Sequence, residues 1–395
     1  MKRFIYADNA ATTCVYPEVA EEIQKCFLES WGNPSSSHAK GYEAKDILSD
    51  SRARIAAVLG CDPSEIYFTS CGTEADNWAI KGAARRLSKK GKNHIVTTAI
   101  EHPAVLNTCK ALEKEGFEVT YLPVDQYGLI SLDELRSSVT EKTAIVAVMY
   151  ANNEIGTIEP IAEITRIAHE GGALMFTDAV QAVGNVDINL HKLGVDMLAL
   201  SGHKLHAPKG IGVLYIKKGV VIDSIIHGGG QESRKRAGTE NIPYIAGLAK
   251  ALEMAKERMS ELPRVAAMRD RLIEGLSKIP YSRVHGHPTE RLPGIANVGF
   301  KFIEGESMLL WLNISGICAS TGSACSSASL DASHVLLATG VPHEEAHGTL
   351  RLSISADTTD EDIDFMLETI PPIVKRLREM SPLWEEIAKE GRENG

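Results

Sequence analysis

The stretch that decides the fold runs from Ala173 to Lys204. Its first half ends Phe176-Thr177-Asp178-Ala179-Val180-Gln181, and its second half ends Ser201-Gly202-His203-Lys204. Each half contains a short apolar run, 173–176 and 197–200, of the kind that forms buried parallel strands. In open α/β sheets, ligands bind beyond the carboxyl ends of the strands. The stretch therefore predicts two neighbouring strands that carry an acid and a lysine into one crevice.

An acid and a lysine in one crevice suit pyridoxal 5'-phosphate (PLP). A lysine amine can form a Schiff base with this cofactor, and a carboxylate such as Asp178 can pair with its pyridinium nitrogen. Either residue alone is more often ordinary, because an aspartate can simply form a turn and most lysines are solvated. The pair at this spacing, with Ser201 and His203 beside Lys204, favours a PLP site.

The chain up to about residue 260 alternates between strand-like and helix-like periods. Besides the two strands above, strands are expected at 65–69, 95–98, 117–124, 143–150 and 212–216, and helices at 74–87, 103–115, 161–169 and 241–259. This βαβ rhythm predicts a doubly wound, mainly parallel sheet. Because 395 residues exceed one ordinary core, we expect two domains, divided near Glu261-Leu262-Pro263.

Composition and charge narrow the function classes. The chain is 44% hydrophobic and 24% charged, as in soluble globular proteins, and its net charge of −10 disfavours nucleic acid or an anionic membrane as main partner. The apolar runs are far too short to span a bilayer, and Asp8 interrupts any N-terminal signal region, so we expect a cytoplasmic location. The seven cysteines include no Cys-x-x-Cys pair, so we expect no metal site.

A candidate phosphate site follows the strand expected at 65–69. The turn after it predicts Thr73 at a helix N-cap, with Asp76 completing a capping pair. Free N–H groups and the helix dipole make such a turn an anion site, although any βα turn favours glycine and threonine. Ser201 and His203 would add two donors, which favours a shared phosphate.

His102 follows another expected strand, 95–98, and precedes a proline. A lone histidine is more often structural than catalytic. At the carboxyl end of a strand, however, its ring could stack on a pyridine ring and move protons near pH 7.

Two further candidates lie in the last quarter of the chain. Residues 319–329 are all small, with Cys325 near the middle, and a cysteine on a mobile loop has value as a nucleophile that can move between places. The alternative is a serine-rich linker with an incidental cysteine. Arg351 lies on a strand expected at 349–355, where it could clamp a carboxylate with two hydrogen bonds or simply be solvated.

Together these residues resemble the cysteine desulfurases, a PLP-dependent family. The resemblance covers nearly the whole chain, and its motifs occur in the same order, at 6–13, 32–38, 69–77, 101–103, 152–156, 178–181, 201–210, 236–241, 321–327 and 349–355. The long serine-rich loop is similar to that of the group serving iron–sulfur cluster assembly. The segments 206–208 and 238–241 are most similar to the nitrogen-fixation type.

The resemblance implies an α/β fold of the aspartate-aminotransferase-like type. A large domain would hold a mainly parallel seven-stranded sheet beside a smaller α+β domain. Residues 15–260 would form the large PLP-binding domain, and residues 1–14 and 261–395 the small domain that carries the Cys325 loop.

The resemblance also implies residue roles. Lys204 would be the PLP-linked lysine, Asp178 the pyridinium partner, His102 the stacking ring and Cys325 the sulfur acceptor. Gln181 would bind the phenolic oxygen of PLP. The phosphate would be bound by Thr73, Ser201 and His203 and, from a second subunit, by Thr239. The substrate carboxylate would be bound by Asn152 and Arg351.

The implied reaction converts L-cysteine to L-alanine and leaves the sulfur on Cys325 as a persulfide. A homodimer would pass that sulfur to an iron–sulfur scaffold protein or another acceptor. A selenocysteine lyase or an aminotransferase of the same fold would use the same PLP apparatus. A non-catalytic sulfur-relay protein is a further alternative, which intact Lys204, Asp178 and Cys325 disfavour. The basic triplet 234–236 is explained better by a nearby phosphate than by nucleic acid.

Overall fold

The computed structural model describes residues 4–321, 332–382 and 384 of the chain. Its central sheet consists of β2 (Ile66–Thr69), β3 (His94–Thr98), β4 (Glu118–Leu122), β5 (Thr143–Ala147), β6 (Leu174–Asp178), β7 (Met197–Ser201) and β8 (Gly212–Ile216). The seven strands lie in the order β2-β8-β7-β6-β5-β3-β4. From β7 to β4 all neighbours pair parallel, whereas β8 runs antiparallel to both β2 and β7. The expected mainly parallel, seven-stranded sheet is confirmed.

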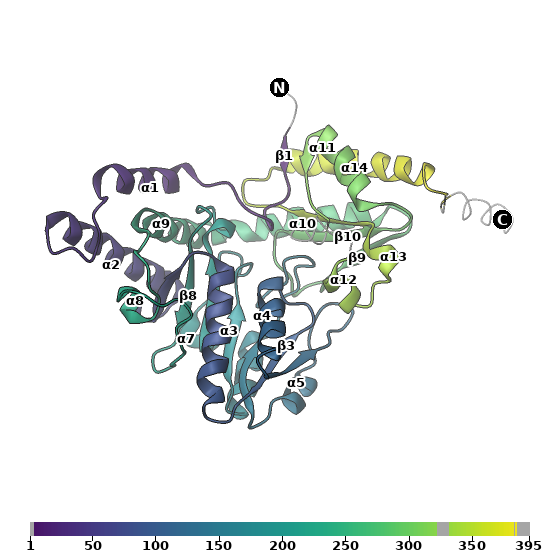
Figure 1. The fold of residues 1–395 in the computed structure, drawn as a ribbon. Helices are drawn as coiled ribbons and strands as arrows, with labels where there is room; N and C mark the ends of the chain where they lie inside the picture. The colour runs from purple at the N-terminus through teal and green to yellow at the C-terminus, as the bar shows by residue number, and fades with distance from the viewer. Residues whose placement is uncertain (1–3, 322–331, 383, 385–395) are drawn as a thin grey trace.

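Helices cover both faces of this sheet, which explains why its central strands are buried along their whole length. The helices around it are α2 (Ala39–Leu59), α3 (Gly72–Ser88), α4 (Pro103–Glu113), α5 (Leu132–Ser138), α6 (Ile161–Glu170), α7 (Leu190–Leu193) and α9 (Ile242–Arg258). One face packs against α3 and α4, which run in front of the sheet in Figure 1, and the other against α2, α6 and α9. All five residues of β5 and of β7 are buried.

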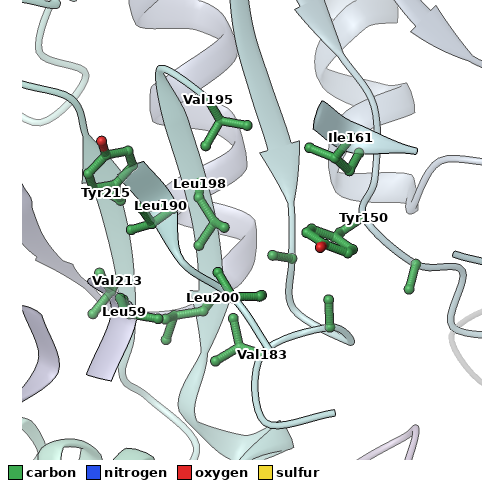
Figure 2. Close-up of a cluster of buried hydrophobic side chains, with 14 of the residues drawn as sticks. Leu59, Tyr150, Ile161, Val183, Leu190, Val195, Leu198, Leu200, Val213 and Tyr215 are labelled. Carbon is green, nitrogen blue, oxygen red and sulfur yellow. The ribbon is translucent and has the colours of Figure 1, made fainter. Parts of the chain in front are cut away.

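Figure 2 shows the core on the second of these faces. Leu198 and Leu200 of β7 and Val213 of β8 point toward Leu59 of α2, and Ile161 of α6 lies in the same cluster. Alternate residues of each strand therefore enter opposite cores, because successive side chains of a strand point to opposite faces. This packing fixes the strand ends, and hence the residues that follow them.

A second hydrophobic cluster holds together the C-terminal part of the chain and the N-terminal strand. Its elements are β1 (Ile5–Tyr6), β9 (Ser282–His285), β10 (Ile295–Phe300), β11 (Ile317–Cys318), β12 (Thr349–Ser353), α10 (Leu262–Ser277), α11 (Gly305–Ser315) and α14 (Asp360–Glu379). β9, β10 and β12 form an antiparallel sheet, and β1 pairs with β11. The division that we propose at residue 260 falls within η3 (Met259–Glu261), which connects α9 to α10.

The remaining helices are α1 (Pro17–Glu29), α8 (Gln231–Arg234), α12 (His334–Ala338) and α13 (His343–Ala346). α1 and α2 extend to one side of the molecule (Figure 1). Among the described residues, we find no helix with the length and apolar character needed to cross a bilayer.

The phosphate turn differs from the sequence prediction. The N-cap of α3 is Cys71, so Thr73 is the second residue of the helix and caps nothing. The Glu74 carboxylate accepts instead from the Ser70 amide, with Ser70 N and Glu74 Oε2 2.8 Å apart. Asp76 does not cap either, because its position on the helix turns it to the buried face.

Candidate active site

A cavity of about 410 Å³ lies where β6 and β7 end. Its wall contains eight of the residues expected from the sequence, namely Thr73, His102, Asp178, Gln181, Ser201, His203, Lys204 and Arg351. Asp178 is the last residue of β6 and Ser201 the last residue of β7. The fold thus brings the expected acid and lysine together at the carboxyl ends of neighbouring parallel strands.

Backbone carbonyls of the N-terminal segment hold the Lys204 amine. Lys204 Nζ lies 2.6 Å from Ala10 O and 2.7 Å from Ala11 O. The Gln181 side chain donates to the same Ala10 carbonyl, with Nε2 and O 2.9 Å apart. The segment before α1 is therefore one wall of the site, which the sequence alone did not predict.

The Asp178 carboxyl and the His102 imidazole lie close together in the wall of the cavity. Burial raises the pKa of Asp178, whereas His102, the Val180 amide and the Lys204 ammonium pull it down. Burial lowers the pKa of His102, and Lys204 adds to this effect while Asp178 opposes it. His102 Nδ1 also caps α4 by accepting from Ala104 N at 3.1 Å, which fixes the orientation of the ring.

The first turn of α3 packs directly on the end of β7. A Cβ atom on Gly72 would lie 2.9 Å from Val180 Cγ2 and 3.4 Å from Ser201 Cβ, so only glycine allows this approach. Thr73 and Ser201 thereby line the cavity together beside a helix N-terminus. His203 follows, and burial, followed by the Lys204 charge, lowers its pKa to about 4. These groups can bind an anion with neutral donors and backbone N–H groups.

Arg351 lies on the side of the cavity formed by the small domain. Its side chain is only 1% exposed, so it is not a solvated strand arginine. Nη2 lies 2.9 Å from Asp8 Oδ1, and Nη1 donates to Asn153 O at 3.1 Å. Nε, also buried, has no hydrogen-bond partner among the described residues. The guanidinium is therefore held in place and keeps a donor for a further acceptor.

Asn152 and Asn153 differ in what their side chains do. Asn152 is buried, and its amide is used within the molecule: Nδ2 donates to Ile100 O at 3.1 Å, and Oδ1 accepts from Glu154 N at 2.8 Å and Ile155 N at 3.0 Å. Asn153 lines the cavity and Asn152 does not. The structure therefore does not support Asn152 as a direct carboxylate ligand and points to its neighbour.

Two predicted site residues remain, Thr239 and Cys325. Thr239 is exposed and does not line this cavity, so its role at the phosphate of a second subunit stays a prediction. Cys325 lies outside the described residues, so its role stays a prediction.

Several residues of the cavity were missed by the sequence reasoning, among them Asp76, Glu154 and His334. Burial raises the pKa of Glu154 to about 7, and its Oε2 lies 2.5 Å from Ser333 Oγ. A signal for Asp76 was present, because it lies on the helix face that Gly72, Ala79 and Ala83 otherwise make small and apolar.

Comparison with known proteins agrees with this geometry. A family model described as aminotransferase class-V matches residues 5–366. The cysteine desulfurase IscS of Methanosarcina thermophila is 56% identical, over 96% of this chain and 94% of its own length. Cysteine desulfurase 2 of Trichormus variabilis is 52% identical, over 96% of this chain and 95% of its own. The chain belongs to the cysteine desulfurases, within the class-V aminotransferases.

Solved structures extend the likeness to three dimensions. A NifS-like protein, 41% identical, superposes with a TM-score of 0.89 over 95% of this chain and 100% of its own. A structure described as SspA in complex with cysteine is 34% identical, with a TM-score of 0.78 over 91% of this chain and 100% of its own. The PLP-dependent transferase fold is therefore confirmed.

Desulfurases of this family depend on PLP, and the residues of the cavity fit the cofactor. Lys204 offers the amine, Asp178 the buried carboxyl for the ring nitrogen, and His102 a ring beside it. Thr73, Ser201 and His203 offer donors for the phosphate. A volume of about 410 Å³ lies within the range of ordinary cofactor pockets.

Proposed function

We propose that this chain removes the sulfur of L-cysteine, releases L-alanine and carries the sulfur on Cys325 for iron–sulfur cluster assembly. One observation supports this most directly: the amine of Lys204, the carboxyl of Asp178 and the guanidinium of Arg351 line a single cavity. An amino acid with its amino group toward Lys204 and its carboxylate toward Arg351 would have its side chain between them.

Each residue has a definite task in this reaction. Bound PLP withdraws electrons from the substrate carbons, which weakens the bonds at Cα and Cβ. Lys204 anchors the cofactor and moves the proton at the substrate Cα. Asp178 would pair with the ring nitrogen and favour a proton there, since burial strengthens such a charge pair. His102 orients the ring from its N-cap position.

Sulfur transfer needs a second nucleophile, and we assign it to Cys325. Its thiolate forms a sulfur–sulfur bond to the substrate as the carbon–sulfur bond of the substrate breaks. The electron pair of that bond passes to the substrate carbon, which takes up a proton and leaves as L-alanine. Cys325 is left as a persulfide that an acceptor thiol can attack.

Arg351 sets the orientation of the substrate. Its guanidinium already pairs with Asp8, and its buried Nε keeps an unused donor, so an incoming carboxylate meets a fixed cation. The Asn153 amide, in the same wall, is the second carboxylate ligand that we propose in place of Asn152. The similar SspA structure, described as a complex with cysteine, supports L-cysteine as the substrate.

We also propose that the working unit is a homodimer in the cytoplasm, with an iron–sulfur scaffold protein or another thiol as sulfur acceptor. Phe27 and Leu28 of α1 and Trp31 just after it are exposed, with 55%, 69% and 69% of their surface accessible. Thr239 is exposed in a glycine-rich segment. A second copy of the chain would cover such apolar surface and place Thr239 at its phosphate site.

The test of the proposed activity is a product balance. The purified protein loaded with PLP is incubated with L-cysteine and a thiol reductant, and alanine and sulfide are quantified. Equal amounts of the two products establish desulfuration. Transfer of the amino group to an added keto acid, without sulfide, would instead make the chain an aminotransferase.

A further inference from the structure

Two acids that line the cavity, Asp76 and Glu154, have no part in the proposed chemistry, and Asp76 lies beside Asp178. Asp76, on the second turn of α3, is 1% exposed and lines the cavity. Its Oδ1 is buried and has no hydrogen-bond partner among the described residues. One side-chain atom of Asp76, one of His102 and one of Asp178 lie within 4.8 Å of one another. A buried carboxyl oxygen without a partner among the described residues thus lies beside the residue that would face the cofactor's ring nitrogen.

Burial and the charges around this carboxyl favour its neutral form. It faces Asp178 at the end of β6, Glu101 and His102 after β3, and Cys71 at the start of its own helix. Burial, then Asp178 and then Glu101 raise the pKa of Asp76 well above its usual range. Like-charged carboxyls this close cannot all ionise, so one of them keeps a proton.

Asp178 is the member of the group that carries the negative charge. Its Oδ1 accepts from the backbone Val180 N at 2.9 Å, and it faces the Lys204 ammonium. Glu101 is occupied elsewhere, because its Oε1 accepts from both Thr98 Oγ1 and Met149 N at 2.8 Å. Asp76 has no such support for a charge, which leaves it as the proton donor of the pair.

We propose that Asp76 is a positioning residue for the cofactor: it stays protonated and donates a hydrogen bond to Asp178, directly or through one water, so that Asp178 remains ionised and oriented toward the ring nitrogen. This inference rests on the proposed function only in that PLP occupies the cavity. If Asp76 only filled space, an apolar side chain would serve better. Burying an apolar side chain beside Ala75 and Ala79 costs less free energy than burying a carboxyl.

The experiment compares two substitutions. Asp76→Asn keeps the size and a neutral donor, whereas Asp76→Leu removes the donor and puts a somewhat larger apolar side chain in its place. For each, the apoprotein is titrated with PLP, and the visible absorption of the loaded protein is followed against pH. We expect Asp76→Asn to bind PLP within about twofold of the parent and Asp76→Leu to bind it roughly tenfold more weakly. The pH midpoint of the absorption change should shift by about one unit in Asp76→Leu only.

A second readout uses the apoprotein alone. An unfolded aspartate ionises near pH 4, so the parent loses stability as pH rises toward the raised folded pKa of Asp76. Asp76→Asn should remove that loss and unfold at a higher temperature at pH 7. Glu159→Gln is the control, because Glu159 is also buried, with its pKa raised to about 8, but lies outside this cavity. It should stabilise the apoprotein and leave PLP binding unchanged.

The outcomes separate cleanly. Parent-like PLP binding and pH midpoint in Asp76→Leu would overturn the proposal, and so would an Asp76→Asn variant that loses as much affinity as Asp76→Leu. If Asp76→Leu does not fold, Asp76→Ala takes its place with the same expectations. Failure of the parent protein to make alanine from L-cysteine would refute the proposed function but would leave these PLP-binding results as they stand.

Discussion

The two ends of the active site are built in opposite ways. At the cofactor end, Asp178, Ser201 and Lys204 come from consecutive strands and lie within a stretch of 27 residues. At the substrate end, Arg351 meets Asp8 across 343 residues and Asn153 across 198. The cofactor end is thus a property of local βα units, whereas the substrate end exists only after the two ends of the chain have packed together.

Because of this difference, we expect substitutions at the two ends of the active site to have different effects. A change at the cofactor end should remove chemistry and leave the fold intact, because the strands that carry the residues are held by two large cores. A change at the substrate end should alter substrate capture first, because the residues there are already paired with one another before substrate arrives. The predictions below test this separation, from the largest expected effect to the smallest.

Lys204→Ala should abolish turnover, because among the described residues no other lysine lines the cavity to anchor the cofactor or move the Cα proton. The yellow absorption of the covalently held cofactor should vanish, although PLP can still bind through its phosphate. Alanine release and the visible spectrum are the measurements. A variant that still made alanine at the parent rate would disprove the assignment of the lysine.

Cys325→Ser should remove persulfide formation but spare the cofactor end. A hydroxyl at neutral pH is a poor nucleophile toward sulfur, whereas PLP binding and the spectral response to L-cysteine depend on Lys204. Alanine, sulfide and protein-bound persulfide are measured, with Cys14→Ser as the control because Cys14 is an exposed cysteine. Equal alanine and sulfide at the parent rate would mean that another thiol, or direct elimination, does the work.

Arg351→Lys should weaken substrate capture with little change in PLP content. A lysine keeps the charge but loses the forked geometry that engages a carboxylate. Loss of one charge-assisted hydrogen bond, about 1.5–3 kcal/mol, should lower kcat/KM for L-cysteine by roughly ten- to a hundredfold. Arg271→Lys is the matched control, since Arg271 is half-exposed and pairs with Asp360 and Asp364 far from the cavity. An unchanged kcat/KM would remove Arg351 from the substrate end.

Thr239→Ala should loosen the cofactor by a smaller amount, because it removes one neutral hydrogen bond to the phosphate, worth about 1 kcal/mol or roughly fivefold in Kd. The effect should appear only in the dimer. PLP retention is measured alongside sedimentation at assay concentrations, where dilution that splits the dimer should release cofactor from the parent as well. A fully active, PLP-loaded monomer would refute the shared site.

His285→Gln should change only the response of the fold to acid. Burial, with Arg283 and Arg291 nearby, lowers the pKa of His285 to about 4. The unfolded histidine takes up a proton near pH 6.5, so the parent keeps full stability above that pH and loses part of it as pH falls toward 4. Thermal unfolding of the apoprotein from pH 4 to 7 should show a shallower loss in the variant. If the unfolding temperature of the variant fell as steeply with pH as that of the parent, His285 would not be the group responsible.

The sequence sufficed wherever a residue's position followed from the end of a strand. Asp178, Ser201 and Lys204 could be placed because short apolar runs identify buried strands and ligands gather at their carboxyl ends. The seven strands were each expected within a few residues of their observed bounds; 143–150, for example, ends at Ala147. Strand ends are thus the most predictable part of this site.

Prediction failed where a shift of a residue or two along the chain, or one contact between distant parts of the chain, decides which side chain enters the site. Asn152 and Asn153 are adjacent and chemically identical, but the turn uses the Asn152 amide internally, whereas Asn153 lines the cavity. Asp76 was taken as part of a cap, because Thr73 was placed two positions too early, at the N-cap of the helix. The Asp8 partner of Arg351 could not be foreseen, since nothing local connects positions 343 residues apart.

The carbonyls that hold Lys204 have a practical consequence. The segment that supplies them is itself fastened to β12, with Asn9 Nδ2 2.8 Å from Ser353 O and Ala10 N 2.9 Å from Ser353 Oγ. An affinity tag or a proteolytic cut just ahead of Ile5 would therefore disturb the position of the Lys204 amine, because these hydrogen bonds connect the segment to it. The colour of a preparation would then report the state of its N-terminus as well as its cofactor content.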